Sequence, residues 1–419
     1  MDFVRYCLGM SNGPLRYLYV DMNSYFASVE QQENPALRGR PVGVIPTDTT
    51  HTCCIAASYE AKWVGVKTGT SVMQAKDICP SIQLVLARPR LYTQYHHRIV
   101  DAVESCLHVD EICSIDEMYG KLMGDERQPA QALALANKVK NAIWRAVGRY
   151  VRCSIGLAPN RWLAKVGTDM QKPDGLVAIL PEEIPQKLYP LALRDLPGIG
   201  KGMSRRLERH GIKTVEQLCQ LSLKKFQQIW ESKVMADIWW AQIHGHDLPS
   251  RATHRRTVSH SHVLAPRYRT DHGARSVMAR MIHKAATRMR TLGYWAMHME
   301  MTVKHTDAPR WTVKTSLGAS GGTNDTLTMV QRMTELWPGR HLGVPVQVCV
   351  VLYDMVPEGS VAPSLFEEPR KHAKLAQAMD QIDKKYGRHA VFHGAMWGAQ
   401  ESAPTRISFT QVPKESDWD

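Results

Sequence analysis

The sequence has few cysteines in positions where they could act together. It holds nine, and only Cys53 and Cys54 stand close to one another, which excludes a paired disulfide framework and a zinc site whose ligands lie two residues apart. Long apolar runs are also missing. None reaches the roughly 18 residues of a membrane span, and the N-terminus lacks the charged-then-apolar order of a signal peptide. We therefore expect a soluble, cytoplasmic protein of a reducing compartment that makes no membrane contact.

Acidic residues are in deficit. The sequence has 40 of them against 53 lysines and arginines, which gives a formal net charge of +13. The deficit is greatest from Arg251 to His305, where eleven basic residues stand against Asp271 and Glu300 alone, a local charge of +9. A solvated helix face usually mixes both signs, whereas contact with a phosphate backbone needs one. Nucleic acid is therefore the predicted partner, and a merely soluble basic protein is the alternative.

The length predicts several domains. At 419 residues the chain exceeds one compact core, and about 100 to 150 residues per domain suggests three or four units. The first part mixes both types of element, which predicts an α+β fold. Its strand candidates are 17–21, 111–120 and 150–156, and its clearest helix is 130–148. Residues 182–246 read as a small helical domain, and the arginine-rich stretch 247–256, which lacks an apolar period, reads as a basic linker.

Beyond the linker, the predicted order is strand, helix, strand, strand, helix, strand. This order predicts a split βαβ module over 257–357. After it we expect a tail, 358–419, with one more helix at 369–386.

The first helix of this module, predicted over 271–292, carries apolar residues at helical spacing on one side. Its other face presents Arg280, Lys284 and Arg288, each four residues apart. We predict that these three side chains contact the phosphate backbone of DNA.

Three carboxylates stand in or at the ends of predicted strands. Asp21 follows the apolar YLYV, and Asp116 and Glu117 lie in the second strand candidate. Hard cations prefer such oxygen ligands, and two divalent ions about 4 Å apart can stabilise both the attacking and the leaving oxygen of a phosphoryl transfer. Successive residues of a regular strand point to opposite faces, so Asp116 and Glu117 share one site only if the strand bends or ends there. Taken alone, each is more often a surface or capping group.

Five motifs give the chain a specific resemblance. They are, in order, YLYVDMNSYFASVE, ASYEAKWVGVKTGTS, SIDEMY, CSIGLAPNRWLAKVGTDMQKPDG and LPGIGKG. Through these motifs, which span 17–202, the sequence resembles the Y-family DNA polymerases, the group that contains DNA polymerase IV and the catalytic subunit of DNA polymerase V. A weaker likeness in layout continues to about residue 390. The resemblance implies a low-fidelity translesion polymerase that uses primer-template DNA and deoxynucleoside triphosphates.

The resemblance also implies a right-hand arrangement and a monomer. The expected parts are a palm (15–25 and 90–172), fingers (26–89), a helical thumb (173–246) and a little finger (257–357). Two other functions stay open at this point. One is a catalytically silent relative that binds DNA as an accessory protein, and the other is a nuclease that uses the same carboxylates.

Motif matching implies roles for single residues. Asp21, Asp116 and Glu117 would hold two Mg²⁺ ions, with the main-chain carbonyl of Met22 as a further ligand. Phe26 falls at the steric-gate position, where an aromatic ring beneath the sugar leaves no room for a ribose 2′-hydroxyl. Ordinary core packing is the alternative for Phe26.

Three further residues fall at positions that contact the incoming triphosphate in the family, namely Tyr59, Lys62 and Lys165. Hydrogen bonds from such donors to phosphate are charge-assisted. Alone, the two lysines would be taken for solvated side chains. Lys62 and Asn23 both resemble the polymerase V branch, whereas the polymerase IV branch usually has arginine and aspartate there, so the branch stays open.

The glycine-rich LPGIGKG lacks the Ser or Thr of a P-loop and follows no convincing strand, so it does not predict nucleotide binding. A helix-hairpin-helix fits better. In that interpretation Gly198 and Gly200 allow close approach to a DNA phosphate, with Lys201 and Arg205 nearby. A turn without any ligand is the alternative.

The last candidate is VAPSLF, residues 361–366. Family members often carry a peptide near the C-terminus that docks on the sliding clamp, and this segment resembles it in Leu365 and Phe366 only. Two exposed apolar anchors could carry a weak interface. The alternative, given equal weight, is that both fold back on the little finger.

Overall fold

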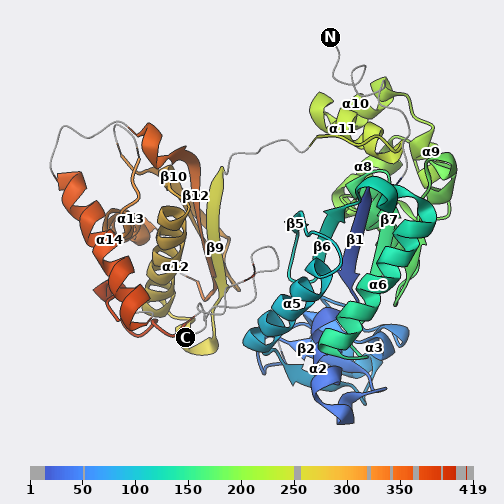
Figure 1. The fold of residues 1–419 in the computed structure, drawn as a ribbon. Coiled ribbons are helices and arrows are strands. Elements are labelled where there is room, and N and C mark those ends of the chain that lie inside the picture. The colour runs from blue at the N-terminus through green and yellow to red at the C-terminus, as the bar shows by residue number, and fades with distance from the viewer. Residues whose placement is uncertain are drawn as a thin grey trace. The chain divides into compact units, whose positions relative to one another are not determined.

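The computed structural model describes residues 15–50, 52–249, 256–318, 322–339, 343–361, 368–387, 390–402 and 412. The chain divides into two compact units, one of residues 1–250 and 407–419 and one of residues 251–406 (Figure 1). Each unit is described by itself below. In the described part of the chain, no helix combines the length and the apolar character that a membrane crossing needs.

The first unit is built on a five-stranded sheet with the strand order β5-β6-β1-β7-β8. β1 is central and buried along its whole length, and it pairs antiparallel with β6 and β7. The strands are β1 Tyr17–Met22, β5 Glu111–Ile112, β6 Glu117–Lys121, β7 Cys153–Ala158 and β8 Leu176–Ala178. The helices beside this sheet are α5 Pro89–Glu104, α6 Pro129–Val147 and α7 Arg161–Met170 (Figure 1).

The two faces of this sheet belong to different cores. Leu18 and Val20 of β1 lie in a core with apolar residues of α5 and α6. Tyr17 and Tyr19 lie in a second core with α7. Because side chains alternate along a strand, Asp21 belongs to the α7 face.

Between β1 and α5 the chain forms a smaller lobe with a sheet of order β3-β2-β4 and a core of its own. Its elements are α2 Tyr25–Glu33, η1 Pro35–Leu37, β2 Val42–Ile45, β3 Ala56–Ala57, α3 Tyr59–Trp63, α4 Val72–Ile78 and β4 Gln83–Leu86. Serine side chains accept the Ala61 and Gln74 N–H groups at the starts of α3 and α4. Such caps let these short helices form despite their length.

The rest of the first unit is a small helical part, as the sequence predicts. Its helices are α8 Lys201–Arg209, α9 Val215–Cys219, α10 Leu223–Trp230 and α11 Lys233–Ile243. Phe226, Trp230 and Trp239 pack ring against ring in its core, with Phe226 and Trp230 stacked at a centroid distance of 4.7 Å.

The second unit has the predicted split βαβ topology. Its sheet has the order β11-β10-β12-β9 with every neighbouring pair antiparallel, so each crossover helix joins two strands that flank a third. The elements are β9 Thr257–Val263, α12 Asp271–Thr291, β10 Tyr294–His305, β11 Trp311–Ser316, α13 Thr326–Leu336 and β12 Pro345–Pro357. Together with the first unit, this confirms the α+β fold class.

The chain after Pro357 is not simply a tail. α14 (Glu368–Tyr386) and the residues after it pack in the second unit, where Met396 and Ala399 join the core around α12. The stretch predicted as a tail thus contains the helix expected at 369–386, and its residues up to 402 that the structure describes pack in the second unit. Sequence periodicity could not show it, because the contacts join residues about a hundred positions apart, such as Arg290 and Asp380.

This packing also corrects the predicted basic face of α12. Arg280 is only 4% exposed, and its Nε donates to the main-chain carbonyl of Ser402. The helix packs on the sheet on one side, and residues 390–402 also pack against it, so some of its polar positions are enclosed as well as its apolar ones. Arg280 therefore does not present a free surface to DNA.

Candidate active site

The predicted metal carboxylates meet where β1 ends and β6 begins. Asp21 pairs in register with Glu117, and the Met22 N–H donates to the Asp116 carbonyl oxygen over 2.8 Å. β6 starts at Glu117, so Asp116 lies in the bend that precedes the strand. The strand thus begins between the two carboxylates, which is the condition under which both can serve one site.

Helix α7 directs a lysine at this strand end. The helix starts after Asn160, whose side-chain oxygen accepts the Leu163 N–H over 2.8 Å, and it packs on β1 and β7. Lys165 therefore reaches the face of β1 that carries Asp21. On the same face, the Tyr19 hydroxyl donates to Oε2 of Glu117 over 2.9 Å.

Two lysines neutralise the buried Asp21. Nζ of Lys165 contacts Oδ2 of Asp21, and it lies 3.0 Å from Oε1 of Glu117 and 3.4 Å from Oδ2 of Asp169. Nζ of Lys172 lies 2.8 Å from Oδ1 of Asp21 and 2.7 Å from Oδ1 of Asp169. Asp21 is 4% exposed, so its charge needs these partners.

The crowding of charge shifts pKa values in the site. Burial raises the pKa of Asp116, and the nearby Asp21 and Glu117 raise it further, although the Ser114 hydroxyl donates to its Oδ1 over 2.6 Å and opposes the shift. Burial alone would lower the pKa of Lys165, but the three carboxylates beside it raise that pKa above its ordinary value. Lys165 is therefore charged at neutral pH, and an added cation would favour the charged form of Asp116.

The donors of the site fit divalent ions. Among the residues that the structure describes, no three Asp, Glu, His or Cys side chains are grouped as metal ligands. Lys165 Nζ instead contacts both Asp21 and Glu117. The donors are nevertheless all carboxylate oxygens, the type that Mg²⁺ prefers. The Lys165 ammonium group, which bridges Asp21 and Glu117, shows that a positive charge is accommodated between these carboxylates. Asp21, Asp116 and Glu117 would be the ligands.

Tyr59 and Lys62 come to the same site from α3. Lys62 Nζ lies 4.7 Å from the centroid of the Tyr59 ring. Burial, and then the charge of Lys172, lowers the pKa of Lys62. The Tyr59 hydroxyl is buried and has no hydrogen-bond partner among the described residues. The site thus has a carboxylate side and a rim of lysine and tyrosine.

Phe26 lies in α2 and is 3% exposed. Its ring stacks on Tyr92 at a centroid distance of 4.6 Å and is tilted against Tyr25 at 5.6 Å. This is the core packing that the sequence left open as the alternative to a steric gate. Whether the ring also borders a bound sugar stays a prediction.

The LPGIGKG turn leads into α8. Gly198 has a φ of 99°, and a Cβ there would lie 2.8 Å from the Trp239 ring, so both backbone conformation and space require glycine. Gly200 precedes the helix as its N-cap, and a Cβ on it would meet nothing within 4 Å. Lys201 and Arg205 are exposed. The open side of Gly200 and the first turn of α8 are thus accessible to a phosphate.

In the second unit, Lys284 and Arg288 of α12 are partly buried rather than freely solvated. Burial, together with these two charges, lowers the pKa of His260 on β9 to about 4. The predicted clamp anchors Leu365 and Phe366 lie outside the described residues.

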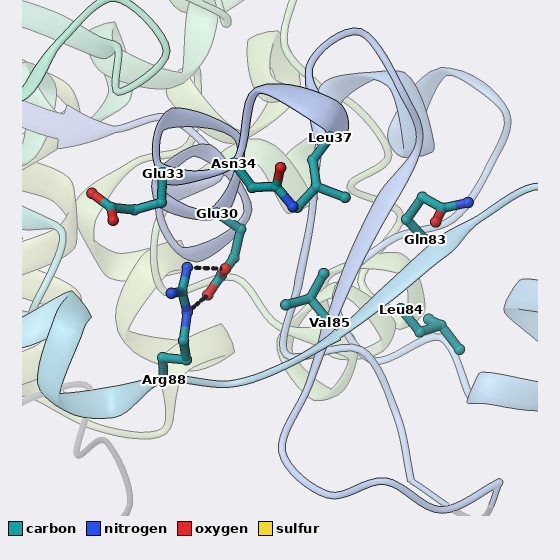
Figure 2. A pocket seen from close by; sticks show the side chains of 8 residues that line it. All are labelled: Glu30, Glu33, Asn34, Leu37, Gln83, Leu84, Val85 and Arg88. Atoms are coloured by element: carbon teal, nitrogen blue, oxygen red, sulfur yellow. Dashed lines mark hydrogen bonds and ion pairs between the residues drawn. The ribbon is translucent and has the colours of Figure 1, made fainter.

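A cavity of about 390 Å³ lies apart from this chemistry, between α2, η1 and β4 (Figure 2). The buried Glu30 accepts from Arg88 at 2.5 and 3.1 Å and from the Tyr92 hydroxyl at 2.6 Å. None of the predicted site residues lines the cavity. The charges of Glu30 and Arg88 are already paired with each other, and we assign the cavity no ligand.

Sequence reasoning missed Lys172 and Asp169, although both stand in the quoted motif GTDMQKPDG. The signal was the spacing. Asp169 follows Lys165 by four residues, and Lys172 follows Asp169 by three, so the three side chains can lie on one side of the helix end.

Three family descriptions match the chain in order. Residues 20–169 match the impB/mucB/samB family, 194–247 match a DNA polymerase-iota thumb domain, and 255–361 match the C-terminal domain of the impB/mucB/samB family. The last match ends before α14, so α14 and the packed residues 390–402 lie beyond it.

Whole-chain relatives agree with these matches. DNA polymerase IV of Pelotomaculum thermopropionicum is 30% identical over 383 residues, which cover 89% of this chain and 93% of the relative. DNA polymerase IV 1 of Bacillus subtilis is 27% identical, with 94% and 96% covered. A Y-family DNA polymerase chimera has the same fold, with a TM-score of 0.68 at 24% identity over 82% of this chain and 99% of that one.

Proposed function

This chain belongs to the impB/mucB/samB family of Y-family DNA polymerases, related to DNA polymerase IV, and from that membership we propose a mechanism for its site. The activity is DNA-directed DNA synthesis of the translesion type. The observation that carries the mechanism is the meeting of Asp21, Asp116 and Glu117 at the ends of β1 and β6.

We propose that two Mg²⁺ ions are the cofactor, held by these three carboxylates and the main-chain carbonyl of Met22. Bound there, they would supply charge neutralisation for the attacking 3′-oxygen and for the leaving pyrophosphate. Asp21 and Glu117 hold positions fixed by strand register, and Tyr19 orients Glu117 through its hydrogen bond. Asp116, in the bend, is placed by Ser114.

The rim would bind the triphosphate of the incoming deoxynucleotide. Lys62, Lys165 and Lys172 offer three positive charges within one small region, and Tyr59 adds a hydroxyl donor. Charge-assisted hydrogen bonds of this kind orient phosphate strongly. Phe26 would lie beneath the sugar and exclude ribonucleotides.

The duplex of the primer-template would be held by residues that lie outside the carboxylate site. We assign phosphate contacts to the start of α8, where a Cβ on Gly200 would meet nothing within 4 Å. The residues are Gly198, Gly200, Lys201 and Arg205. Lys284 and Arg288 are kept as candidate phosphate contacts of the second unit, and Arg280 is withdrawn because it is buried.

Domain roles follow from these assignments. The unit up to residue 250 would supply palm, fingers and thumb, and residues 257–357 with the packed segment 368–402 would form the little finger. We further propose a cytoplasmic monomer whose Leu365 and Phe366 dock on the sliding clamp. Changing both to alanine should leave synthesis on a bare primer unchanged and remove the stimulation by a loaded clamp. Full stimulation of that variant would refute the docking role.

The function is tested by primer extension on undamaged and abasic templates with each of the four nucleotides, run beside a strand-degradation assay. We expect extension on both templates and no degradation. Degradation without extension would identify a nuclease that uses the same carboxylates. DNA binding without either reaction would identify an accessory protein.

A further inference from the structure

Both oxygens of the buried Asp21 already contact an ammonium group. Lys172 holds its Oδ1 at 2.8 Å, and Lys165 holds its Oδ2. Lys165 also holds Oε1 of Glu117 at 3.0 Å. Two of the carboxylates assigned to the metal therefore already face ammonium groups, and a divalent cation that binds them has to compete with both lysines.

Asp169 mirrors Asp21 in this arrangement. Its Oδ1 lies 2.7 Å from Lys172 Nζ, and its Oδ2 lies 3.4 Å from Lys165 Nζ. The four side chains form a closed ring of alternating charge in which each lysine is shared by two aspartates. They differ in burial, because the Asp169 side chain is 34% exposed and that of Asp21 is 6% exposed. Each amine can therefore leave Asp21 without losing its only anionic partner.

The position of Asp169 does not favour the helix that carries it. α7 ends at Met170, so Asp169 lies in the last turn, where a negative charge meets the negative end of the helix dipole. Lys165 precedes it by four residues, which is the less favourable order for such a pair. Helix stability is thus no reason for an aspartate here, whereas its contacts with two amines are.

We propose that Asp169 is a positioning residue that retains the amines of Lys165 and Lys172 at the rim of the site when Asp21 and Glu117 release them for a divalent cation. The proposal rests on the proposed function. Before a divalent cation binds, the two lysines neutralise the carboxylates. Asp169 lowers the free energy needed to displace these lysines. The same two amines are then held where the triphosphate of the incoming nucleotide arrives.

The test measures Mn²⁺ binding to the metal-free, full-length protein without DNA or nucleotide, from the electron paramagnetic resonance signal of free Mn²⁺. Asp169→Asn should raise the Mn²⁺ dissociation constant about tenfold, because the amines then stay on Asp21. Lys165→Met should lower it by about the same factor, because a competing cation is gone. Asp169→Glu should restore an affinity close to that of the wild type.

The matched control is Asp174→Asn. Asp174 pairs with Lys140 at 2.6 Å in the same segment, and Lys140 keeps three main-chain carbonyl acceptors when that charge is lost. Its Mn²⁺ affinity should equal that of the wild type.

The loss of a negative charge could itself weaken Mn²⁺ binding, and the decisive arm removes both amines. In a Lys165→Met, Lys172→Met background, Asp169→Asn should change the dissociation constant by less than about twofold, because its partners are gone. A tenfold effect that persists there would show that Asp169 acts through its own charge, and it would overturn the proposal. An unchanged affinity in the single Asp169→Asn variant would do the same.

Failure of the proposed function would look different. If the wild type binds no Mn²⁺, or if Asp116→Ala binds it as well as the wild type does, then the metal site itself is wrongly assigned. If Asp116→Ala loses Mn²⁺ while the Asp169 variants behave like the wild type, only the role of Asp169 fails.

Discussion

The carboxylate site of the first unit and helix α12 of the second both bury charge, but they compensate it in different ways. Asp21 is neutralised by the ends of two long lysine side chains, Lys165 and Lys172. Arg280 is compensated by a main-chain carbonyl in a packed segment, and Arg290 by Asp380 of α14 at 2.6 Å. The first kind of partner can swing away, whereas the second is part of the fold. Buried charge is therefore available for chemistry in one unit and fixed as structure in the other.

A variant of Arg280 tests this contrast most directly. Arg280→Ala should lower the free energy of unfolding by about 3 kcal/mol, because it leaves the Ser402 carbonyl without its donor and removes a buried stem. The salt dependence of DNA binding should not change. Chemical denaturation and DNA titrations at several salt concentrations measure both quantities, with the exposed Arg267→Ala as the control. Unchanged stability with a shallower salt slope would instead place Arg280 at the DNA.

Phe26 tests whether a core residue of the first unit also contacts the nucleotide substrate. If its ring also borders the sugar, Phe26→Ala should raise the ratio of ribonucleotide to deoxynucleotide insertion about a hundredfold. The ratio of kcat/KM values measures this, and it is independent of how much folded enzyme the variant yields. A lower activity with the same ratio would leave Phe26 a packing residue against Tyr92 alone.

The fixed charges of the second unit predict a pH effect. Burial with Lys284 and Arg288 lowers the pKa of His260 from 6.5 to about 4, so between these values the unfolded chain binds more protons than the folded one. Stability should fall by about 2 kcal/mol between pH 8 and pH 5 on this account.

Thermal melts across that range should show a smaller loss for His260→Gln than for the wild type. His272→Gln, at an exposed position on α12, should not alter the pH dependence. The same acid sensitivity in His260→Gln would show that another group carries it.

The smallest predicted effect concerns the turn before α8. Replacing Lys201 and Arg205 by alanine should weaken primer-template binding about tenfold and reduce the salt slope by about two. Stability should not change, since both side chains are exposed. Lys224 and Lys225, exposed on α10, give a control of equal charge. Equal losses for both pairs would mean that the turn has no special role.

The carboxylate site, which is built at strand ends, was the part of the molecule that the sequence predicted best. Asp21 and the Asp116, Glu117 pair could be placed because a motif marks each strand, and register then brings them together. Lys172 was not predicted: its spacing places it beside Asp169, but nothing in that spacing shows that it also reaches Asp21, 151 positions earlier.

The second unit shows the opposite case. Its strand and helix order was predictable from local periodicity, and the split βαβ topology followed from that order. The exposure of α12 was not. Residues that cover a helix from about a hundred positions away leave no trace in its own spacing, so Arg280 was taken for a surface residue.

The central claim is that the three carboxylates form one metal-dependent polymerase site, and Asp116→Ala tests it most directly. The variant should lose primer extension by several orders of magnitude, since a metal ligand contributes several kcal/mol to transition-state stabilisation. Its affinity for primer-template DNA should stay close to that of the wild type, because basic residues elsewhere hold the duplex. Near-normal turnover in a clean preparation of Asp116→Ala would contradict the account.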